Sequence, residues 1–294
     1  MKKLYTTLLI NSLFISSAAF SADKILQPEK GGVKNIEYTQ NKPTLTIANY
    51  NIAAGRVSSI QDIAKAIIKL DADVVTLEEV DNKTNRSGHI DQMGELAKLT
   101  GMHAQFGKAM SFDGGEYGLG ILSKYPIKTH QVFKLPSGDG EQRIVLASEF
   151  IPDGFPTPVI VLATHLDWKE DPATRLNQIR EIENISVGNT DSNFKDIASK
   201  VKLLSGDFND TPNSSVLKEL ERYWNDITLN NVDMRTWPAV NPALEIDHIL
   251  TFNGQKWDTK SISIPNKTAV TQGIDWPSTS DHVPLSATLT LLEQ

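Results

Sequence analysis

The sequence predicts an α/β protein in which mixed β-sheets are covered by helices on their outer sides. Segments with strand periodicity alternate with amphipathic helical segments in some parts of the chain and follow one another directly in others. This mixture argues against a purely parallel, doubly wound sheet. At 294 residues, without internal repeats or convincing linkers, the chain is long enough to bury a large core. We therefore expect a single domain over residues 44–294.

The first strands and helices follow from periodicity and capping. Residues 44–50 alternate β-branched and apolar side chains, as a half-buried strand does. A helix is expected from Ser58 or Ser59 to Leu70, because its apolar residues keep helical spacing. A short buried strand, residues 73–77, then leads into an acidic cluster, and a second helix is expected near residues 91–100.

Later elements are bounded by Gly, Pro and Asn, which punctuate regular structure. Helices are expected over residues 172–184 and 213–222, and residues 223–245 are expected to be irregular. Strands are expected over residues 103–108, 118–123, 127–135, 144–150, 158–164, 201–204, 245–252, 260–264 and 284–291.

Residues 1–43 have the composition of an export signal followed by a loose lead-in. Two lysines precede an apolar run from Leu8 to Ala19, and residues 19–21 form a small-x-small cleavage site. The run is too short for a membrane span. Residues 1–21 are therefore predicted to be a signal peptide and residues 22–43 a polar lead-in. The expected location is periplasmic or secreted, and no cysteine is present to carry a lipid anchor.

Composition excludes several kinds of site. The chain has no cysteine, so disulfides, thiolate metal sites and a cysteine nucleophile are absent. The formal net charge is −7, and removing the two lysines of the signal peptide (−7 − 2) makes the mature chain −9. Avid nucleic-acid binders are usually basic, so this acidity argues against a tightly bound nuclease. It does not argue against hydrolysis of phosphate esters.

One stretch, residues 203–210, suggests chemistry at the end of a strand. An apolar run reaches Ser205 and Gly206 and then delivers Asp207 and Asn209. Two residues apart on a strand, these side chains point to one face. A carboxylate beside an amide can bind a phosphate ester and direct a water molecule at it. A simple turn explains the same residues, because Asp, Asn and Gly populate turns for backbone reasons.

The same kinds of residue recur at the ends of other apolar strands. Ligand sites of α/β sheets gather at strand ends, so one pocket built from many strands is expected. Carboxylate oxygens suit a hard cation such as Mg²⁺, Mn²⁺ or Ca²⁺, and imidazoles can stabilise charge in phosphoryl transfer. Each residue alone fits a turn, a solvated acidic face, a core histidine or a surface pair. The positions are Asn51, Glu79, His165, Asp207 with Asn209, Asp247 with His248, and Asp281 with His282.

Six motifs in order resemble the endonuclease/exonuclease/phosphatase superfamily. They are TIANYNIAAG around Asn51, DVVTLEEV with Glu79, THLD at 164–167, GDFND at 206–210, IDHIL at 246–250 and SDHVPL at 280–285. YGLGILSKYPI at 117–127 and EQRIVL at 141–146 also match common stretches. The superfamily includes pancreatic-type deoxyribonucleases, abasic-site repair nucleases, bacterial sphingomyelinases and inositol-polyphosphate 5-phosphatases.

The resemblance implies a four-layer α/β sandwich with two mixed β-sheets face to face, and a Mg²⁺-dependent phosphoester hydrolase; Mn²⁺ or Ca²⁺ also suits it. Glu79 matches the family's metal-binding glutamate, and the glutamine that usually precedes it is Glu78 here. Asn51 matches an amide that positions the metal or the phosphate. Asp281 is expected near the metal.

The resemblance also implies catalytic roles. Asp207 matches the residue that activates or orients water, and Asn209 its phosphate-contacting neighbour. His282 matches the histidine that stabilises the phosphoryl charge, and Asp247 the carboxylate that orients it. His165 matches a second catalytic histidine of the deoxyribonuclease-like and sphingomyelinase-like branches.

The resemblance implies two further roles, which rest on weaker matches. Glu116 is expected to orient His165, and Arg143 to hold a phosphate or buttress the site. His248 stands where the family often has Tyr. Trp168, Trp237 and Trp276 flank motifs and line the pocket mouth or pack in the core.

The expected partner is a phosphoester: nucleic acid, a phospholipid headgroup or a small phosphodiester. No protein partner and no stable membrane insertion are predicted, and the protein is expected to be a monomer. A true nuclease is the alternative within this chemistry. A catalytically silent binding module on the same fold, or a Ca²⁺-stabilised structural protein, are alternatives from other classes.

Overall fold

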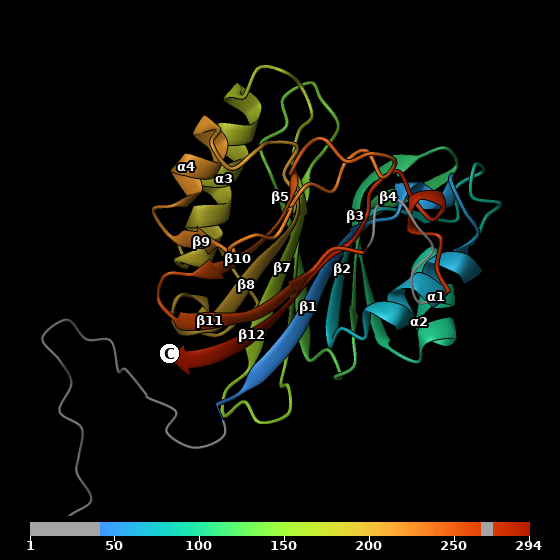
Figure 1. The fold of residues 1–294 in the computed structure, drawn as a ribbon. Coiled ribbons are helices and arrows are strands. Elements are labelled where there is room, and N and C mark those ends of the chain that lie inside the picture. The colour runs from blue at the N-terminus through green and yellow to red at the C-terminus, as the bar shows by residue number, and fades with distance from the viewer. Residues whose placement is uncertain (1–41, 266–272) are drawn as a thin grey trace, which may run out of the picture. The chain divides into compact units, whose positions relative to one another are not determined.

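Two six-stranded β-sheets pack face to face between two layers of helices in the computed structural model, which describes residues 42–265 and 273–294 (Figure 1). The predicted signal peptide, residues 1–21, and residues 22–41 of the lead-in lie outside the described residues. In order, the first sheet contains β11 (Lys256–Ser263), β12 (Leu285–Glu293), β1 (Thr44–Asn51), β2 (Val74–Asn82), β4 (Gly115–Ser123) and β3 (His103–Phe112). The second contains β5 (Thr129–Lys134), β6 (Ile144–Phe150), β7 (Val159–His165), β8 (Val201–Asp207), β10 (Asp247–Phe252) and β9 (Trp224–Asp226).

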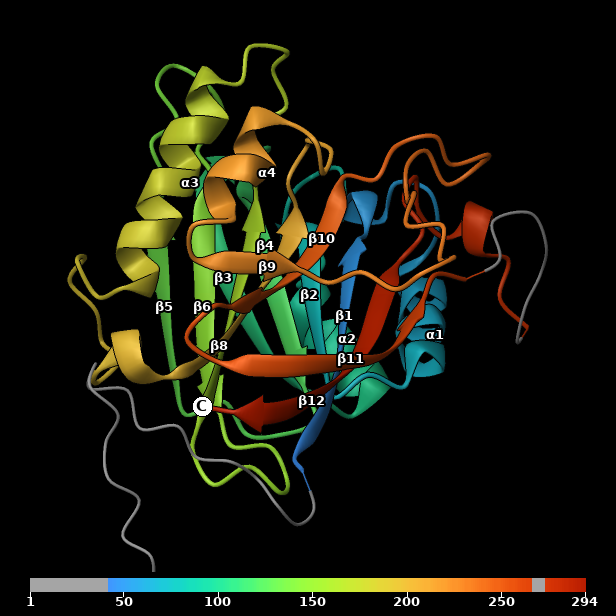
Figure 2. The same cartoon turned by 60° about the vertical axis from the view of Figure 1, so that its left-hand side comes forward.

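Helices cover the outer face of each sheet, which confirms the predicted four-layer sandwich. Figure 2 shows α3 (Ala173–Ser186) and α4 (Ser215–Leu220) over the second sheet, while α1 (Ile60–Leu70) lies on the opposite side, where α2 (Gln92–Thr100) contacts it. Of the two predicted caps, Ser58 and Ser59, it is Ser59 that caps α1, because its side chain accepts a hydrogen bond from the Asp62 backbone N–H. No helix within the described ranges is long and apolar enough to cross a membrane.

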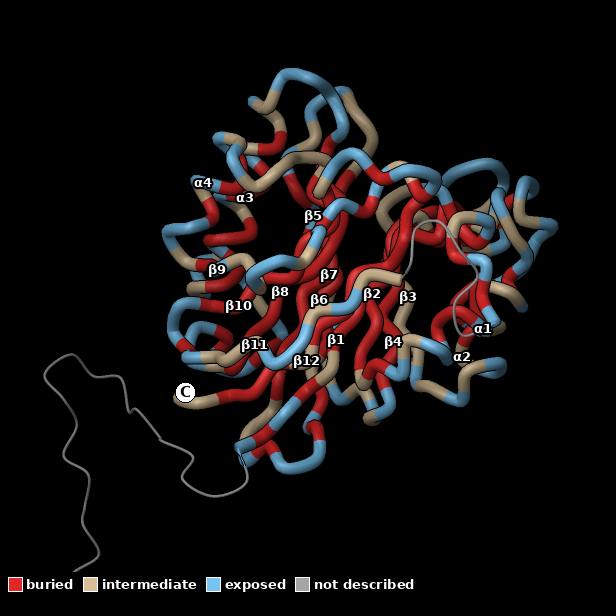
Figure 3. Tube along the Cα trace, viewed as in Figure 1, coloured by how far each residue is buried: buried red, intermediate tan, exposed pale blue. Residues whose placement is uncertain are grey.

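Alternation along the strands explains why the central strands of both sheets are buried on both faces, whereas the edge strand β11 is largely exposed (Figure 3). In β1, Leu45 and Ile47 point between the sheets, whereas Ala48 and Tyr50 point toward the helices. Strands β7 and β8 divide their side chains in the same way between the inter-sheet core and the α3–α4 layer. This two-sided burial accounts for the near-continuous apolar runs in the sequence.

Several element boundaries differ from the sequence prediction. Strand β2 does not end at Leu77 but continues to Asn82 through a bulge, because its register with β4 shifts between Leu77 and Val80. Strand β11 begins four residues earlier than predicted, at Lys256, and the expected irregular segment contains β9. Strands β3 and β4 are also longer than expected, because each pairs along its whole length with the other.

One rim of the sandwich collects the predicted functional residues. Strands β1 and β2 are parallel to each other, as are β7 and β8, so their carboxyl ends bring Asn51, Glu79, His165 and Asp207 to the same side. Strand β10, which begins at Asp247, is antiparallel to β8, and β12 is antiparallel to β1. These two strands therefore start at the rim where the other four end.

We predict that Gly206→Ala destabilises the protein and disturbs the position of Asp207. Gly206 pairs with Thr164 of β7 and His248 of β10, and a Cβ there would lie 1.9 Å from the Thr164 carbonyl oxygen. Because that contact is with backbone, strands would have to move, at a cost of about 1–3 kcal/mol or more. Urea unfolding measures this. Wild-type stability would show instead that β7 and β8 separate at little cost.

Candidate active site

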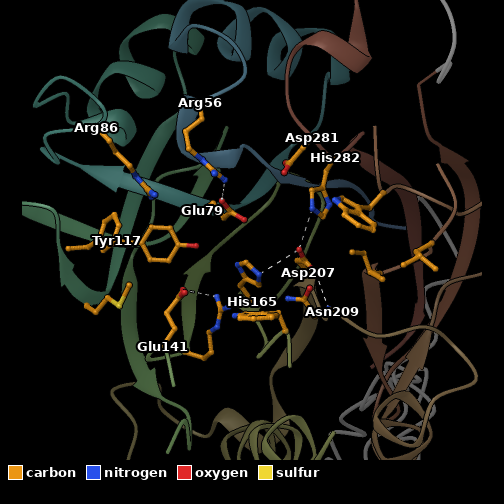
Figure 4. A pocket seen from close by; sticks show the side chains of 17 residues that line it. Arg56, Glu79, Arg86, Tyr117, Glu141, His165, Asp207, Asn209, Asp281 and His282 are labelled. Atoms are coloured by element: carbon orange, nitrogen blue, oxygen red, sulfur yellow. Dashed lines mark hydrogen bonds and ion pairs between the residues drawn. The ribbon is translucent and has the colours of Figure 1, made fainter. Parts of the chain in front are cut away.

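A pocket of about 480 Å³ opens at this rim, between the ends of the two sheets (Figure 4). Of the predicted site residues, seven line it: Glu79, Arg143, His165, Asp207, Asn209, Asp281 and His282. The other two, Asn51 and Asp247, lie directly behind the lining and hydrogen-bond to residues that do line it. Sequence reasoning missed further lining residues: Arg56, Arg86, Met110, Phe112, Tyr117, Glu141, Leu244 and Ile246.

Asp207 lies at the centre of the site, at the end of β8. Its Oδ2 is 3.6 Å from Nε2 of His165 and 3.6 Å from Nε2 of His282. Asn51 donates to the same oxygen at 3.1 Å, and the Asn209 backbone N–H donates to Oδ1 at 2.9 Å. Burial and the neighbouring Asp247 raise the pKa of Asp207 to about 6. At neutral pH this carboxylate is ionised and can still accept a proton.

His282 is held as an imidazolium by Asp247. Its Nδ1 donates to Asp247 Oδ2 at 2.8 Å, and both residues are buried. Burial alone would lower the pKa of His282, but the Asp247 charge and hydrogen bond outweigh it and raise the pKa to about 10. Since Nδ1 is occupied, Nε2 is the nitrogen that faces Asp207 and the pocket.

His165 has the opposite protonation state. Burial, Arg143 and the charge on His282 hold the pKa of His165 well below its usual value. The imidazole is therefore neutral at physiological pH. Two histidines on either side of one carboxylate thus differ in charge, a pattern that separates proton acceptors from proton donors in active sites.

Glu79 reaches the pocket because of the bulge in β2. Its φ is 52°, a left-handed value that non-glycine residues rarely adopt and that marks a constrained position. Its carboxylate accepts from Arg56 at 2.8 Å through Oε2 and from Asn51 at 3.3 Å through Oε1. The bulge also separates Glu79 from its neighbours: Glu78 and Asp81 are fully buried.

Glu79 offers oxygen atoms that suit a hard divalent cation, but Asn51 does not, because its Oδ1 accepts from the Ala53 backbone N–H at 3.0 Å and its Nδ2 donates to Glu79 and Asp207. The Glu79 carboxylate lies at the pocket wall, and Asp281 lines the same pocket. Within the described residues, a tighter group of acidic and imidazole side chains is Asp207, Asp247 and His282. The imidazole of that group is committed to Asp247, so the carboxylates of Glu79 and Asp281 are the donors at the pocket that could hold a cation.

Three other expectations have different outcomes. Asn209 projects its amide at the rim but donates it to the Leu166 carbonyl at 3.0 Å. Arg143 is buried and pairs with Glu141 at 3.0 Å, at the edge of the pocket. The proposed orienting role of Glu116 is wrong: its carboxylate pairs with Lys108 at 2.9 Å and accepts from Asn82, away from His165.

A buried polar layer supports the site from below and connects the two sheets. Asn49 of β1 donates to Asp247 of β10 at 3.0 Å and accepts from Thr76 of β2 and Ser205 of β8 at 2.8 and 3.2 Å. All four residues are essentially inaccessible to solvent. Because buried polar groups are costly unless paired, this layer specifies how the sheets align beneath the pocket.

The side chain of Glu78 lies among these groups without a hydrogen bond. It is fully buried, and neither carboxylate oxygen has a hydrogen-bond partner within residues 42–265 and 273–294. Burial, together with the charges of Asp247 and Asp207, raises its pKa well above the usual value. Glu78 is therefore a neutral carboxylic acid, which explains how it can replace the glutamine expected from the family resemblance.

His248 belongs to the support of the site and not to a second metal centre. Its Nδ1 contacts Asp226 at 2.7 Å and its Nε2 donates to the Asp210 carbonyl at 3.0 Å, so both ring nitrogens are used. Burial opposes its charge, but Asp226 raises the pKa of His248 to about 9. The cationic ring thereby ties β9 to the loop that follows Asp207.

Of the three tryptophans, two line the pocket and one packs in the core. Trp168 and Trp237 line the pocket and are 67% and 38% exposed, whereas Trp276 is 2% exposed and packs in the α1–α2 core. No signal in the sequence distinguished Arg56 or Arg86 from ordinary loop arginines. Tyr117 could have been found, because it opens the YGLGILSKYPI stretch of the family resemblance.

Comparisons with known proteins agree with this geometry. The model of the Endonuclease/Exonuclease/phosphatase family matches residues 48–282. The uncharacterized protein YbhP of Escherichia coli (strain K12) is 24% identical over 260 residues, which cover 84% of this chain and 95% of YbhP.

Solved structures show the same fold. An endonuclease/exonuclease/phosphatase from Bacteroides vulgatus has a TM-score of 0.66 at 19% identity, over 85% of this chain and 100% of that one. Mannosyl-6-phosphatase Bt3783 of Bacteroides thetaiotaomicron VPI-5482 has a TM-score of 0.63 at 16% identity, over 84% and 99%. Truncated TDP2 of Caenorhabditis elegans has 0.59 at 18%, over 84% and 97%.

Asp247→Asn should shift the alkaline limb of the pH–rate profile. In the wild type, rates should rise through about pH 6 as Asp207 ionises and fall near pH 10 as His282 loses its proton. Without the Asp247 charge, burial lowers the pKa of His282, so the alkaline limb moves toward neutral pH. A rate loss on the order of 10²-fold at pH 8 is expected. An unmoved limb would contradict the assignment; Asp258→Asn, on β11 and outside the pocket, is the control.

Glu78→Gln should stabilise the protein, and more so at higher pH. Because folding raises the pKa of Glu78, this group contributes fully to the free energy of unfolding only below the pKa that it has in the unfolded chain. The contribution is lost as pH rises toward the pKa of the folded state, because the unfolded chain can then ionise the group while the folded protein keeps it protonated. Glutamine removes this loss, so the gain in melting temperature should be larger at pH 8 than at pH 5. Glu221→Gln, exposed at the end of α4, should show no such difference. A lower melting temperature at both pH values would mean that the carboxyl group has a required partner.

Proposed function

The chain belongs to the Endonuclease/Exonuclease/phosphatase family, and we propose that it is an exported, divalent-metal-dependent hydrolase in which water attacks the phosphorus of a phosphoester. One observation carries the proposal: a single carboxylate, Asp207, lies 3.6 Å from a neutral and from a cationic imidazole. In-line attack requires a proton acceptor for water and positive charge for the phosphoryl oxygens, and this arrangement supplies both.

Asp207 is the residue that orients and deprotonates the water. Its Oδ2 faces the pocket between the two imidazoles, and its Oδ1 is fixed by the Asn209 backbone N–H. Because its pKa is raised to about 6 by burial and by Asp247, the carboxylate is a stronger base than an ordinary aspartate. Neutral His165, on its other side, can relay the proton.

His282 supplies the positive charge. Its Nε2–H points toward the same region, and Asp247 keeps the ring protonated and fixes its orientation. As negative charge develops on the non-bridging phosphoryl oxygens, the hydrogen bond from this donor becomes stronger, and no solvent has to reorganise. The same imidazolium is an acid from which the departing oxygen can receive a proton.

Glu79, with Asp281 in the same pocket, would hold the cation. A divalent ion there would act as a Lewis acid on a phosphoryl oxygen and so lower the barrier to attack. The chain's own contribution is to aim the Glu79 carboxylate, through its strained backbone and the hydrogen bond that it accepts from Nδ2 of Asn51. Mg²⁺ is proposed, and Mn²⁺ or Ca²⁺ would suit the same oxygen donors.

The pocket favours a small phosphoester or a headgroup over a long nucleic-acid strand. About 480 Å³ is the size of a small-molecule site. Arg56 and Arg143 pair with carboxylates that line the same pocket, and Arg86 alone does not make the basic track that a strand needs. The likeness to a mannosyl-6-phosphatase agrees with such a substrate. A nuclease is the alternative.

Export and a monomeric state complete the proposal. Export is supported by the lysines, apolar run and small-x-small site of residues 1–21. Fractionation of cells expressing the full chain tests it, with release into the periplasm expected.

The test is hydrolysis of a substrate panel with Mg²⁺, Mn²⁺ or EDTA, using Asp207→Ala as the control. The panel holds a generic phosphodiester, a sugar phosphate monoester, plasmid DNA, RNA and sphingomyelin. We expect metal-dependent turnover that falls on the order of 10²-fold or more in the variant. Turnover of DNA or RNA alone would favour the nuclease. Metal binding without turnover of any substrate would favour a binding module.

A further inference from the structure

Arg86 lies in the pocket wall at a distance from the reacting groups. In Figure 4, Glu79 lies between Arg86 on one side and Asp207 and His282 on the other. A group bound at Arg86 is therefore separate from a phosphate bound at Asp207.

The Arg86 side chain is fixed before any ligand binds. The fully buried carboxylate of Asp81 accepts from Nε at 2.7 Å and from Nη2 at 2.8 Å, and Thr84 donates to the same carboxylate at 2.7 Å. The guanidinium carbon lies 4.5 Å from the ring centre of Phe112 and 5.5 Å from that of Tyr117. Such a preorganised side chain loses little conformational entropy on binding.

Donors remain free on the outer edge of the guanidinium. A guanidinium has five N–H groups, and two of those of Arg86 donate to Asp81. The other three have no hydrogen-bond partner within residues 42–265 and 273–294. The Tyr117 hydroxyl, on the same wall, also makes no hydrogen bond within those ranges (Figure 4). Burial and the Glu79 charge raise the pKa of Tyr117, so the hydroxyl remains a donor.

The counterion of Arg86 distinguishes it from the other two arginines of the pocket. The partners of Arg56 and Arg143 are Glu79 and Glu141, which themselves line the pocket. Asp81 does not line the pocket, because it lies behind Arg86 in the core. Arg86 therefore turns its negative partner away from the ligand and its free N–H edge toward it.

We propose that Arg86, together with Tyr117, forms a subsite for a second oxyanion on the substrate, a phosphate or a carboxylate apart from the phosphoryl group that is attacked. The planar edge of an arginine binds either group through two parallel hydrogen bonds. This inference deepens the proposed function and rests on it, because the reacting phosphate at Asp207 defines the other group as the second one. The preferred substrates are then phosphoesters that carry two anionic groups.

Calorimetry with Mg²⁺-loaded protein tests this without relying on turnover. The ligands are propyl, butyl, pentyl and hexyl phosphonates, the α,ω-bisphosphonates of the same chains, and the matching ω-carboxyalkyl phosphonates. At the best chain length, the second oxyanion should tighten binding by about 10-fold to 100-fold, as expected of charge-assisted hydrogen bonds. The carboxylate series shows whether the subsite accepts both groups or phosphonate alone, and either result supports it.

Two variants test whether Arg86 is responsible for the gain in affinity that the second oxyanion gives. In Arg86→Lys, an ammonium can still neutralise Asp81 but has no planar edge, so the gain should fall to about 2-fold or less. The double variant Asp81→Asn with Arg86→Met avoids an unpaired buried charge and should lose the gain as well. Arg222→Lys, an exposed arginine beside α4 and outside the pocket, should keep it.

The outcomes separate this inference from the proposed function. If bisphosphonates and carboxyalkyl phosphonates bind no better than monophosphonates at any chain length, the subsite is overturned while the phosphoryl site stands. If the gain survives in both Arg86 variants, the subsite lies elsewhere and the assignment is wrong. If no phosphonate binds at all, the phosphoryl site itself fails, and this inference fails with it.

Discussion

The hydrogen bond from Asn49 to Asp247, across the interface between the two sheets, is the interaction on which the site depends. It lies in a buried layer where Thr76 and Ser205 also donate to Asn49. Above this layer the side chains are catalytic, and below it they are apolar. Because each buried polar atom requires its partner, a sliding of one sheet over the other would break several hydrogen bonds together. The two halves of the pocket are thus held in register.

The same layer sets the charges of the site. Asp247, fixed by Asn49, keeps His282 protonated, and that positive charge then helps to keep His165 neutral. Asp207 lies between the two rings, where burial makes it a better base. Both rings are buried, and their opposite protonation states therefore follow from the carboxylate that only His282 has as a hydrogen-bond partner, with Arg143 adding to the effect at His165. The pair of Arg86 and Asp81, on the other side of Glu79, resembles the pair of His282 and Asp247, because a buried carboxylate again fixes a cationic side chain.

Much of the fold was predictable because its signals are local. Alternating apolar residues gave the strands, Ser59 gave the start of α1, and recurring polar residues at strand ends gave the rim of the pocket. The bulge in β2 was not predictable, because the pair Glu78-Glu79 looks like the exit of a strand, and only pairing with β4 shows that it continues. Arg86 was missed because its importance comes from Asp81 and Phe112, contacts formed by tertiary packing. Glu116 was misassigned because its partner, Lys108, lies on the neighbouring strand.

The central claim is that water held by Asp207 attacks phosphorus. A single turnover in ¹⁸O-enriched water, with enzyme in excess over a phosphomonoester or phosphodiester substrate, tests it most directly. Mass spectrometry of the products should find one ¹⁸O atom in the released phosphate or phosphomonoester and none in the alcohol. Label in the alcohol would mean that carbon is attacked. An unlabelled phosphorus product in the first turnover would mean that a carboxylate side chain attacks phosphorus and that water then hydrolyses the acyl phosphate at its carbonyl carbon; either result would contradict the account.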